Sequence, residues 1–229
     1  MDPAAILKQR LTDEHFKRIQ AIRSPAFHEF LARFIQHLNP DSVFVGTDDP
    51  EDLAHVRKTA VSSGEERELR IPGHTLHFDG YRDQARDKEN TRILPPAGES
   101  LGSTINTMDR ERGIGEIMGI MKDIMKGHRL FVRFFCLGPL DSEFSLPCVQ
   151  LTDSPYVAHS EDLLYRQGYE QFRKTVKDGR FFRFVHSEGR LENGVSADID
   201  RRRVYIDLQE DAVYSANTQY GGNTIGLKK

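Results

Sequence analysis

The sequence predicts an α/β protein in which a mixed sheet is flanked by helices. Two apolar runs, Leu130–Leu137 and Leu146–Leu151, are nearly continuous, as is typical of strands that are covered on both faces. Apolar side chains instead recur at helical spacing in residues 24–39. A β-branched and aromatic strand at residues 42–46 is followed by a polar helical stretch that ends near residue 63, and this succession favours an α/β fold.

The N-terminal part of the chain is expected to be helical. Ser24 can cap a helix with proline in its first turn, and Asn39, which is followed by another proline, ends it. One or two weaker helical segments precede this helix, so residues 1–38 are interpreted as an N-terminal helical segment. The rest of the chain, residues 39–229, is interpreted as one domain.

Two further helices and four further strands are expected downstream. Asp109 can cap a helix whose isoleucine and methionine side chains share one stripe as far as Gly127, and Ser160 is expected to cap another. The charged segment 82–92 has few apolar anchors and is expected to form a surface loop. Short apolar or β-branched segments are expected to be strands at residues 75–78, 181–186, 203–208 and 212–216.

Composition limits the partners that the protein can have. The 32 basic and 35 acidic residues give a net charge of −3, which argues against broad electrostatic binding of nucleic acid or of an anionic membrane. No apolar stretch approaches the length of a membrane span and no signal peptide is recognisable, so a cytoplasmic protein is expected. Cys136 and Cys148 lie in the apolar runs and are expected to be free core thiols rather than a disulfide.

Two polar segments contain the residues that could bind a ligand. Residues 85–91 (ARDKENT) alternate in charge, and by pattern alone they are typical of a solvated loop. Residues 220–229 (YGGNTIGLKK) follow a predicted strand; their glycines let backbone N–H groups approach an anion, and their lysines supply positive charge. This tail is not a Walker A phosphate loop, because Leu227 stands where that motif requires lysine.

Three motifs together resemble the GTP-dependent phosphoenolpyruvate carboxykinases. They are the YGGN tail with its two lysines, the VQLTDS segment at residues 149–154, and ARDKENT, and their order and approximate spacing agree with that family. The phrases RFFCLGP and QLTDSPYVAHSEDLLYRQGY resemble its archaeal branch. The resemblance extends from about Asn39 to Lys229 and implies the family's N-terminal, substrate-binding domain. ARDKENT departs from the family pattern in its middle residues, so Arg86 carries over and its neighbours do not.

The resemblance also implies a reaction. The family converts oxaloacetate and GTP into phosphoenolpyruvate, GDP and carbon dioxide, in gluconeogenesis or anaplerosis. The enolate left after decarboxylation is stabilised there by a divalent metal, usually Mn²⁺, while Mg²⁺ accompanies the nucleotide. By resemblance Lys229 is a ligand of that Mn²⁺, which requires a neutral amine. Lys228 by resemblance reaches both the substrate and the transferred phosphoryl group.

The contacts to oxaloacetate and phosphoenolpyruvate are implied in the same way. Arg86 resembles an arginine that binds a substrate carboxylate through its planar fork of donors. Tyr220 resembles a tyrosine against which that carboxylate or the released carbon dioxide rests, Gly221 and Gly222 can donate backbone N–H groups to the same anion, and Asn223 shapes the turn. Ordinary roles stay open for these residues: a surface ion pair, a core tyrosine beside a simple turn, and solvated lysines.

The histidines are interpreted as structural. His74 and His77 lie three residues apart on a predicted strand and point to opposite faces, which argues against a shared metal. His159 and His186 are assigned no ligand.

The remaining parts of the family's active site lie downstream of the two lysines. They are a histidine and an aspartate that bind the metal, a kinase-type phosphate loop and a guanine pocket, and none is found in the 229 residues. The chain is therefore expected to be truncated before the nucleotide-binding domain and to show no turnover alone. The alternative is a non-catalytic module that binds a small dicarboxylate. The sequence does not set the oligomeric state.

Overall fold

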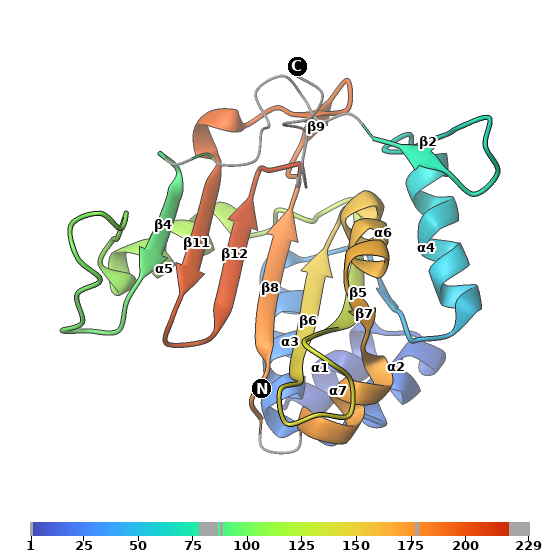
Figure 1. Cartoon of the computed structure of the whole chain (residues 1–229), viewed down its shortest axis with the longest axis horizontal. Coiled ribbons are helices and arrows are strands. Elements are labelled where there is room, and N and C mark those ends of the chain that lie inside the picture. Colours follow the sequence, from blue (N-terminus) through green and yellow to red (C-terminus); the bar gives the residue numbers. More distant parts are fainter. Residues whose placement is uncertain (1, 78–86, 88, 177–178, 220–229) are drawn as a thin grey trace.

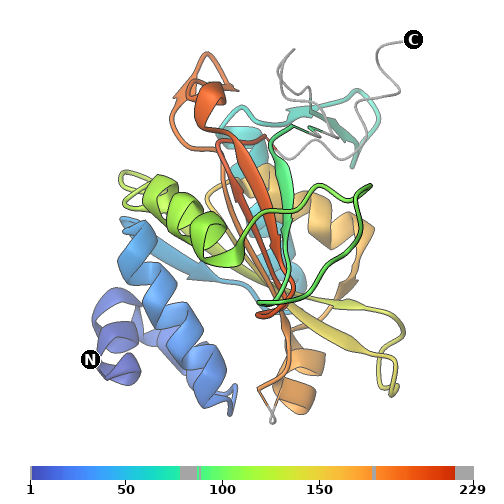
Figure 2. The same ribbon diagram turned by 90° about the vertical axis from the view of Figure 1, so that its left-hand side faces the viewer.

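An eight-stranded mixed sheet forms the centre of the molecule, with helices on both of its faces (Figure 1 and Figure 2). The computed structural model describes residues 2–77, 87, 89–176 and 179–219. The predicted α/β class is confirmed. The helices are α1 (Pro3–Arg10), α2 (Asp13–Gln20), α3 (Pro25–Leu38), α4 (Pro50–Ser62), α5 (Arg110–Met121), α6 (Pro155–Leu164), α7 (Tyr169–Thr175) and the 3-10 turn η2 (Ile199–Arg201).

The sheet combines parallel and antiparallel pairs. Its order is β1-β5-β6-β8-β12-β11-β4, with β7 paired to β5 off this path. The pairs β1–β5, β6–β8, β8–β12 and β11–β4 are parallel, whereas β5–β6 and β11–β12 are antiparallel. The strands of this sheet are β1 (Ser42–Val45), β4 (Thr91–Leu94), β5 (Arg129–Leu137), β6 (Leu146–Thr152), β7 (Arg166–Gln167), β8 (Phe182–Ser187), β11 (Arg203–Asp207) and β12 (Ala212–Ala216).

Two small antiparallel hairpins lie beside the main sheet. One pairs β2 (Arg67–Glu68) with β3 (Thr75–Leu76), and the other pairs β9 (Leu191–Glu192) with β10 (Val195–Ser196). Both lie toward the upper edge of the sheet in Figure 1.

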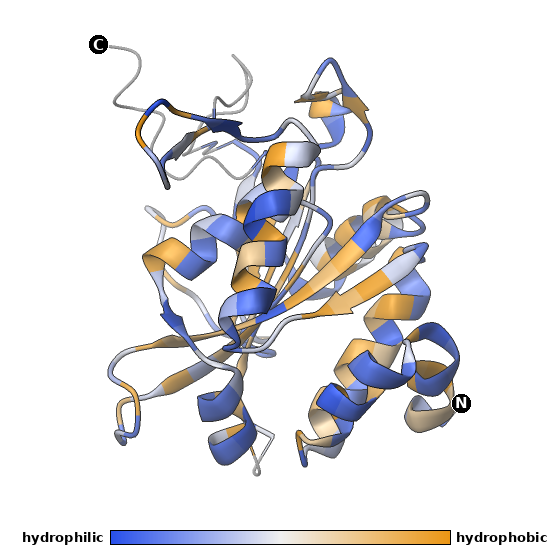
Figure 3. Ribbon diagram, turned by 90° about the vertical axis from the view of Figure 1, so that its right-hand side faces the viewer, coloured by the Kyte–Doolittle hydropathy of each residue, from blue (hydrophilic) through white to orange (hydrophobic). Residues whose placement is uncertain are grey.

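The N-terminal helices cover one face of the sheet. The Ser24 hydroxyl accepts a hydrogen bond from the Phe27 backbone N–H and Pro25 occupies the first turn, so α3 starts where the sequence predicts. Asn39 ends it in the left-handed conformation. Its apolar stripe joins the core under β5, β6, β8 and β12, and Figure 3 shows the apolar strands between helices with polar outer faces. None of the helices described here is long and apolar enough to cross a membrane.

The opposite face is covered only in part. Helices α4 and α6 pack on each other over β1 and β5, where Phe44, Val56, Phe131 and Ala158 form a second apolar cluster. In Figure 1 these helices lie on the right, while the same face of β8, β12, β11 and β4 has none of the described helices in front of it.

Most of the predicted elements are confirmed. The helices at 25–38 and 50–62, two shorter helices before them, and the strands at 42–45, 129–137, 146–152, 182–187, 203–207 and 212–216 lie where the sequence places them, with ends that shift by a few residues. The strand predicted at 75–78 is shorter, since β3 contains two residues. Cys136 and Cys148 are free and buried, as expected.

Three predictions about elements are wrong. Ser160 lies inside α6, and the cap is Ser154, whose hydroxyl accepts a hydrogen bond from the Val157 N–H at 3.1 Å. The segment 82–92 is not a loop throughout, because its last two residues start β4 in the main sheet. Helix α5 ends well before Gly127.

The early end of α5 has a tertiary cause. Asp123 adopts a left-handed conformation, and its backbone N–H donates to the carbonyl oxygen of His37 at 2.9 Å. The N–H of Met125 donates to Leu38 at 3.0 Å. These bonds to the end of α3 replace the helical bonds that α5 would otherwise make, while Met125 remains buried in the core.

Candidate substrate site at one edge of the sheet

The carboxyl ends of three parallel strands meet at one edge of the sheet. Strands β6, β8 and β12 end there, and the antiparallel pairing of β12 with β11 places the starts of β11 and β4 at the same edge. It is the upper edge in Figure 1. In α/β proteins, ligands commonly bind outside the carboxyl ends of parallel strands, so this edge is the candidate site.

In the sequence, the predicted site residues lie just before β4 and just after β12, two strands that start or end at this edge. Arg86, Tyr220, Gly221, Gly222, Asn223, Lys228 and Lys229 all lie outside the described residues, so their convergence stays a prediction. The described residues next to them are Asp87 and Gln219. Strand β4, which begins four residues after Asp87, starts at this edge, and Gln219 follows the end of β12.

Polar contacts join the two flanks. A carboxylate oxygen of Asp87 lies 3.9 Å from a guanidinium nitrogen of Arg202, and the same side chain accepts two hydrogen bonds from Asn90 at 2.7 and 3.1 Å. The Asn217 side-chain amide donates to the carbonyl oxygen of Arg201 at 3.1 Å. The segment after β12 is thus held to the turn before β11, and that turn approaches the segment before β4.

A buried histidine anchors the end of β12. His186 Nε2 lies 2.9 Å from the Thr218 carbonyl oxygen, and Nδ1 lies 2.7 Å from the Thr152 hydroxyl. Burial lowers the pKa of His186 to about 4, so the imidazole is neutral near pH 7. Nε2 must then carry the proton that Thr218 accepts, and Thr152 donates to Nδ1. The ends of β6, β8 and β12 are tied together by this one ring.

A buried carboxylate holds the turn after β8. Asp153 accepts hydrogen bonds from the Ser187 hydroxyl at 2.5 Å and from the Glu188 backbone N–H at 3.0 Å. Burial raises its pKa, although both hydrogen bonds act in the opposite direction. Asp153 and Ser154 therefore shape the edge at the end of β6, one through this turn and the other through the cap of α6.

A second pair of carboxylates lies beside Asp153. Glu65 accepts hydrogen bonds from the Ser154 hydroxyl at 2.6 Å and from the Tyr156 backbone N–H at 3.1 Å. Burial, together with the charges of Glu65 and Asp153, raises the pKa of Glu188 well above its usual range. The raised pKa of Glu188 lessens the negative charge at this edge of the sheet.

Two other histidines at this side of the molecule, His159 and His77, contact single side chains from distant parts of the sequence. His159 Nδ1 lies 2.7 Å from a carboxylate oxygen of Glu66, and although burial acts against it, hydrogen bonds from His159 and Thr75 lower the pKa of Glu66. The ring of His77 stacks on that of Tyr156 with 3.5 Å between their centroids. Within the described ranges no group of three or more histidine, cysteine, aspartate or glutamate side chains could hold a metal ion.

Comparison with known proteins identifies the family. A family model described as the phosphoenolpyruvate carboxykinase N-terminal domain matches residues 29–229. The chain belongs to the phosphoenolpyruvate carboxykinase family. It is 57% identical over 230 residues to the phosphoenolpyruvate carboxykinase [GTP] of Thermococcus sibiricus and 58% identical over 224 residues to that of Thermococcus kodakarensis. A protein of the same name from Sulfurisphaera tokodaii is 41% identical over 219 residues.

The chain spans little more than a third of the length of these phosphoenolpyruvate carboxykinases. The alignments cover 100%, 97% and 96% of this chain but 37%, 36% and 34% of the three relatives. They also correct the extent of the resemblance, which was expected to begin near Asn39. The family model begins at residue 29, inside α3, and the alignment with the Thermococcus sibiricus protein reaches the whole chain.

Sequence reasoning overlooked several residues at this edge of the carboxykinase domain. Asp153 and Ser154 were part of a recognised motif, but nothing local indicated that one holds the turn after β8 and the other caps α6. Glu65 and Glu188 carried no signal, since each is an ordinary acidic residue in a polar segment. Only the meeting of distant segments turns these side chains into one buried cluster.

Proposed function

We propose that the whole protein is a GTP-dependent phosphoenolpyruvate carboxykinase that converts oxaloacetate and GTP into phosphoenolpyruvate, GDP and carbon dioxide. This chain supplies the half of the site that binds oxaloacetate or phosphoenolpyruvate. The observation that carries the proposal is the match of the family's N-terminal domain to residues 29–229, together with relatives at 57 and 58% identity that are named phosphoenolpyruvate carboxykinase [GTP].

The geometry of the edge supports this proposal. Asp87, which follows Arg86, and Gln219, which precedes the glycine-rich tail, lie at the side of the sheet where β4 starts and β12 ends. Asp87 contacts Arg202, and Asn217 donates a hydrogen bond to the neighbouring Arg201. The raised pKa of Glu188 lessens the negative charge that would oppose an anion at this edge. A dicarboxylate substrate requires cationic groups and N–H donors around it, and we propose that Arg86 and the residues of the glycine-rich tail supply them at this edge.

Each proposed site residue has one task. Arg86 binds a substrate carboxylate in bidentate fashion. Tyr220 supports that carboxylate or the leaving carbon dioxide, while the backbone N–H groups of Gly221 and Gly222 donate to it and Asn223 shapes the turn. The remaining two residues are Lys228, which offsets charge on the substrate and the transferred phosphoryl group, and Lys229, which binds the metal as a neutral amine.

The cofactors follow from the same proposal. Mn²⁺ bound at Lys229 would act as a Lewis acid that stabilises the negative charge of the enolate. GTP with Mg²⁺ would be bound by the C-terminal region that the longer relatives have beyond the aligned part. The protein would act in the cytoplasm, where oxaloacetate and GTP are both available.

The test compares two proteins. The first is this chain, and the second is this chain joined in frame to the C-terminal region of the Thermococcus kodakarensis relative. We expect GTP- and Mn²⁺-dependent formation of phosphoenolpyruvate from oxaloacetate by the second protein and none by the first. Family-like turnover by the 229-residue chain, or none by the extended protein when it is folded, would overturn the proposal.

Metal binding gives an independent readout. Lys229→Met keeps the length of the side chain but removes the lone pair, so we expect weaker binding of Mn²⁺ by the extended protein in a titration followed by electron paramagnetic resonance. Lys126→Met, at an exposed position after α5, is the matched control and should bind Mn²⁺ as the parent does. Equal affinities in both variants would show that Lys229 is not a ligand.

A further inference from the structure

A pocket lies between α3, α5 and the turn that joins β11 to β12, on the face of the sheet that the N-terminal helices cover. Its volume is about 290 Å³. Helix α3 contributes Arg33 and Phe34 to its lining, α5 contributes Ile114 and Met118, and β12 contributes Tyr214. In Figure 2 both helices lie on the left side of the sheet, α3 in blue and α5 in green. We call this hollow the α3–α5 pocket.

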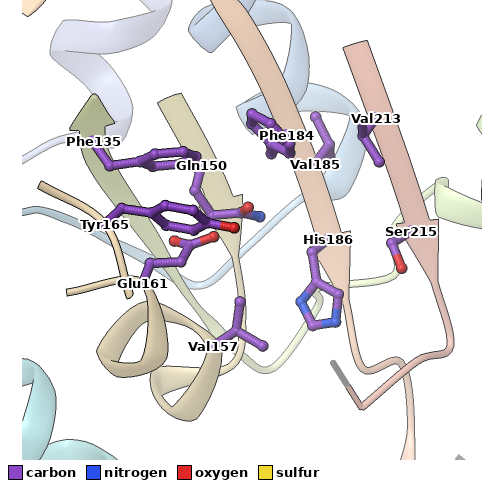
Figure 4. A pocket seen from close by; sticks show the side chains of 10 residues that line it. All are labelled: Phe135, Gln150, Val157, Glu161, Tyr165, Phe184, Val185, His186, Val213 and Ser215. Carbon is purple, nitrogen blue, oxygen red and sulfur yellow. The ribbon is translucent and has the colours of Figure 1, made fainter. Parts of the chain in front are cut away.

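The α3–α5 pocket is separate from the candidate substrate site. It adjoins Asp207 at the end of β11 and Glu210 in the turn before β12, whereas the candidate substrate edge is the one where β11 starts and β12 ends. A smaller cavity of about 120 Å³, shown in Figure 4, lies beside α6 on the opposite face of the sheet, and its lining includes His186. That cavity adjoins the substrate edge through His186, whereas the α3–α5 pocket is at the other end of the strands.

One hydroxyl group in the pocket lacks a partner within the described ranges. Tyr214 is only 2% exposed, and its ring stacks on that of Phe34 with 6.0 Å between their centroids. Its hydroxyl makes no hydrogen bond to any residue that the structure describes. Burial raises the pKa of Tyr214 to about 12, so near pH 7 the group carries a proton that it can donate. Buried polar groups in folded proteins normally have partners, so an acceptor that enters the pocket would complete this one.

Arg33 brings to the same pocket a cation that no carboxylate among the described residues neutralises. Its guanidinium group lies 4.9 Å from the centroid of the Phe34 ring, which is a cation–π contact. The two carboxylates of the pocket are engaged elsewhere. Asp207 contacts Arg110 through both of its oxygens at 2.8 Å, and Glu210 lies 3.9 Å from Arg110. Arg33 therefore has its donors available for an anion.

The charge around the Tyr214 hydroxyl also favours an anion. The charged side chains that act electrostatically on this group are three arginines and two acidic residues, namely Arg33, Arg110, Arg183, Asp207 and Glu210. Three positive charges against two negative ones leave a surplus of one positive charge. All of these side chains except Arg183 line the pocket, which indicates that the hydroxyl end of Tyr214 faces it.

Helix α5 gives the pocket an apolar wall. Ile114 and Met118 are four residues apart, so they lie on one side of the helix, and both are half-buried against the core. His37 Nε2 lies 2.8 Å from the Met118 carbonyl oxygen, and this hydrogen bond holds α5 to α3. The bond fixes the apolar wall relative to Arg33, which is on α3. A ligand that fits the pocket therefore combines an apolar body with acceptor atoms at one end.

We propose that the α3–α5 pocket binds a small organic anion. Its carboxylate or phosphate group lies between the Tyr214 hydroxyl and the Arg33 guanidinium, which can bind either group in bidentate fashion. Its apolar body contacts Ile114 and Met118. The volume of the pocket is close to the lower limit of about 300 Å³ for small-molecule sites, so the ligand is small. The inference goes beyond the carboxykinase reaction and does not depend on it.

The test uses benzoate as the probe and the methionine methyl groups as reporters. The 229-residue chain is labelled with carbon-13 at those methyl groups and titrated with benzoate while NMR spectra are recorded. The aromatic ring should shift the resonance of Met118 much more than that of Met108, which precedes α5 and does not line the pocket. The dependence of the Met118 shift on concentration gives the dissociation constant.

Three further probes examine what the pocket recognises. Phenyl phosphate keeps the ring and changes the anionic group, so the tighter of benzoate and phenyl phosphate identifies the preferred head group. Acetate lacks the apolar body and benzamide lacks the charge, so each should bind at least about tenfold more weakly than that tighter probe. Acetate or benzamide that binds as tightly would overturn the proposal.

Two substitutions remove the polar contacts while keeping the size of the side chains. Arg33→Met removes the cation and should weaken binding of the tighter probe by at least about tenfold. Tyr214→Phe removes only the hydroxyl and should weaken it by about fivefold. Arg112→Met, at an exposed position of α5 that does not line the pocket, is the matched control and should bind as the parent does. Thermal unfolding without ligand checks that all three variants are folded.

The titrations are repeated with the chain extended by the Thermococcus kodakarensis C-terminal region, and we expect the same order of affinities. Four outcomes would overturn the pocket: no binding of either benzoate or phenyl phosphate, loss of binding in the extended protein, shifts that leave Met118 unchanged, or binding by Arg33→Met as tight as by Arg112→Met. Turnover enters none of these readouts, so each outcome is independent of the proposed carboxykinase reaction.

Discussion

His186 Nε2 lies 2.9 Å from the carbonyl oxygen of Thr218 and so fixes the end of β12 to the end of β8. The glycine-rich segment begins two residues after Thr218. Protonation of His186 would remove the hydrogen-bond acceptor that Thr152 uses and place a charge in the core. We therefore expect acid to destabilise the fold close to the proposed substrate residues.

The first prediction concerns acid stability. The folded imidazole has a pKa of about 4, against 6.5 for an ordinary histidine, so the unfolded chain binds the proton first as pH falls. The stability that His186 contributes is fully present above pH 6.5 and is lost as pH falls toward 4. His186→Gln keeps an N–H donor without this titration. Urea unfolding should therefore show the stability of the parent falling relative to the variant by about 3 kcal/mol between pH 7 and pH 4.

The second prediction concerns Glu188, whose contribution to stability depends on pH in the direction opposite to that of His186. Burial raises the pKa of Glu188, so the folded state holds a proton that the unfolded chain releases above its own, lower pKa. The stability associated with this carboxyl is thus lost as pH rises. Glu188→Gln should make the protein more stable than the parent at pH 8, and the advantage should shrink as pH falls toward 4. An advantage that is the same at pH 4 and at pH 8 in thermal unfolding would show that the pKa of Glu188 is not raised in the folded state.

The third prediction contrasts two glycines. A Cβ atom on Gly168 would lie 2.5 Å from the backbone carbonyl carbon of Phe135, where α7 begins against β5, and the backbone cannot move aside cheaply. Gly168→Ala should lower the free energy of unfolding by about 2 kcal/mol or more. Gly115, exposed on α5, has nothing within 4 Å of its would-be Cβ. Gly115→Ala should instead raise stability by about 1 kcal/mol, because alanine favours the helix.

The fourth prediction concerns the ion pair that fastens α5 to β11. Arg110 contacts both carboxylate oxygens of Asp207 at 2.8 Å, and the Asp207 side chain is fully buried. Arg110→Met leaves a buried carboxylate without its cation and should cost about 3 kcal/mol of stability. Asp207→Asn in the same chain should recover part of this loss. If the double variant is as unstable as the sum of the single ones, the two side chains are not coupled.

The fifth prediction concerns Arg86 in the extended protein. Lysine provides one point charge in place of a planar fork, so Arg86→Lys should raise the KM for oxaloacetate by roughly tenfold and change kcat less. Arg173→Lys, on the exposed surface of α7, is the control and should leave both constants unchanged. Kinetics of Arg86→Lys equal to those of the control would remove Arg86 from the substrate site.

The sequence by itself determined the fold class, the family and most of the secondary structure. Helix α3 and strands β5, β6 and β12 could be predicted because their signals are local: a cap, a proline, and an apolar period that matches one type of element. The motifs at residues 85–91, 149–154 and 220–229 were sufficient for the family. Their roles in binding remain predictions.

Only the tertiary structure decided which distant groups meet. Helix α5 ends early because the C-terminal end of α3 offers it better hydrogen bonds, and the short β4 becomes a strand because β11 lies beside it. The shifted pKa values of His186 and Glu188 arise from burial between segments far apart in the chain, and no local pattern encodes burial of that kind. The order of the strands is likewise a matter of packing.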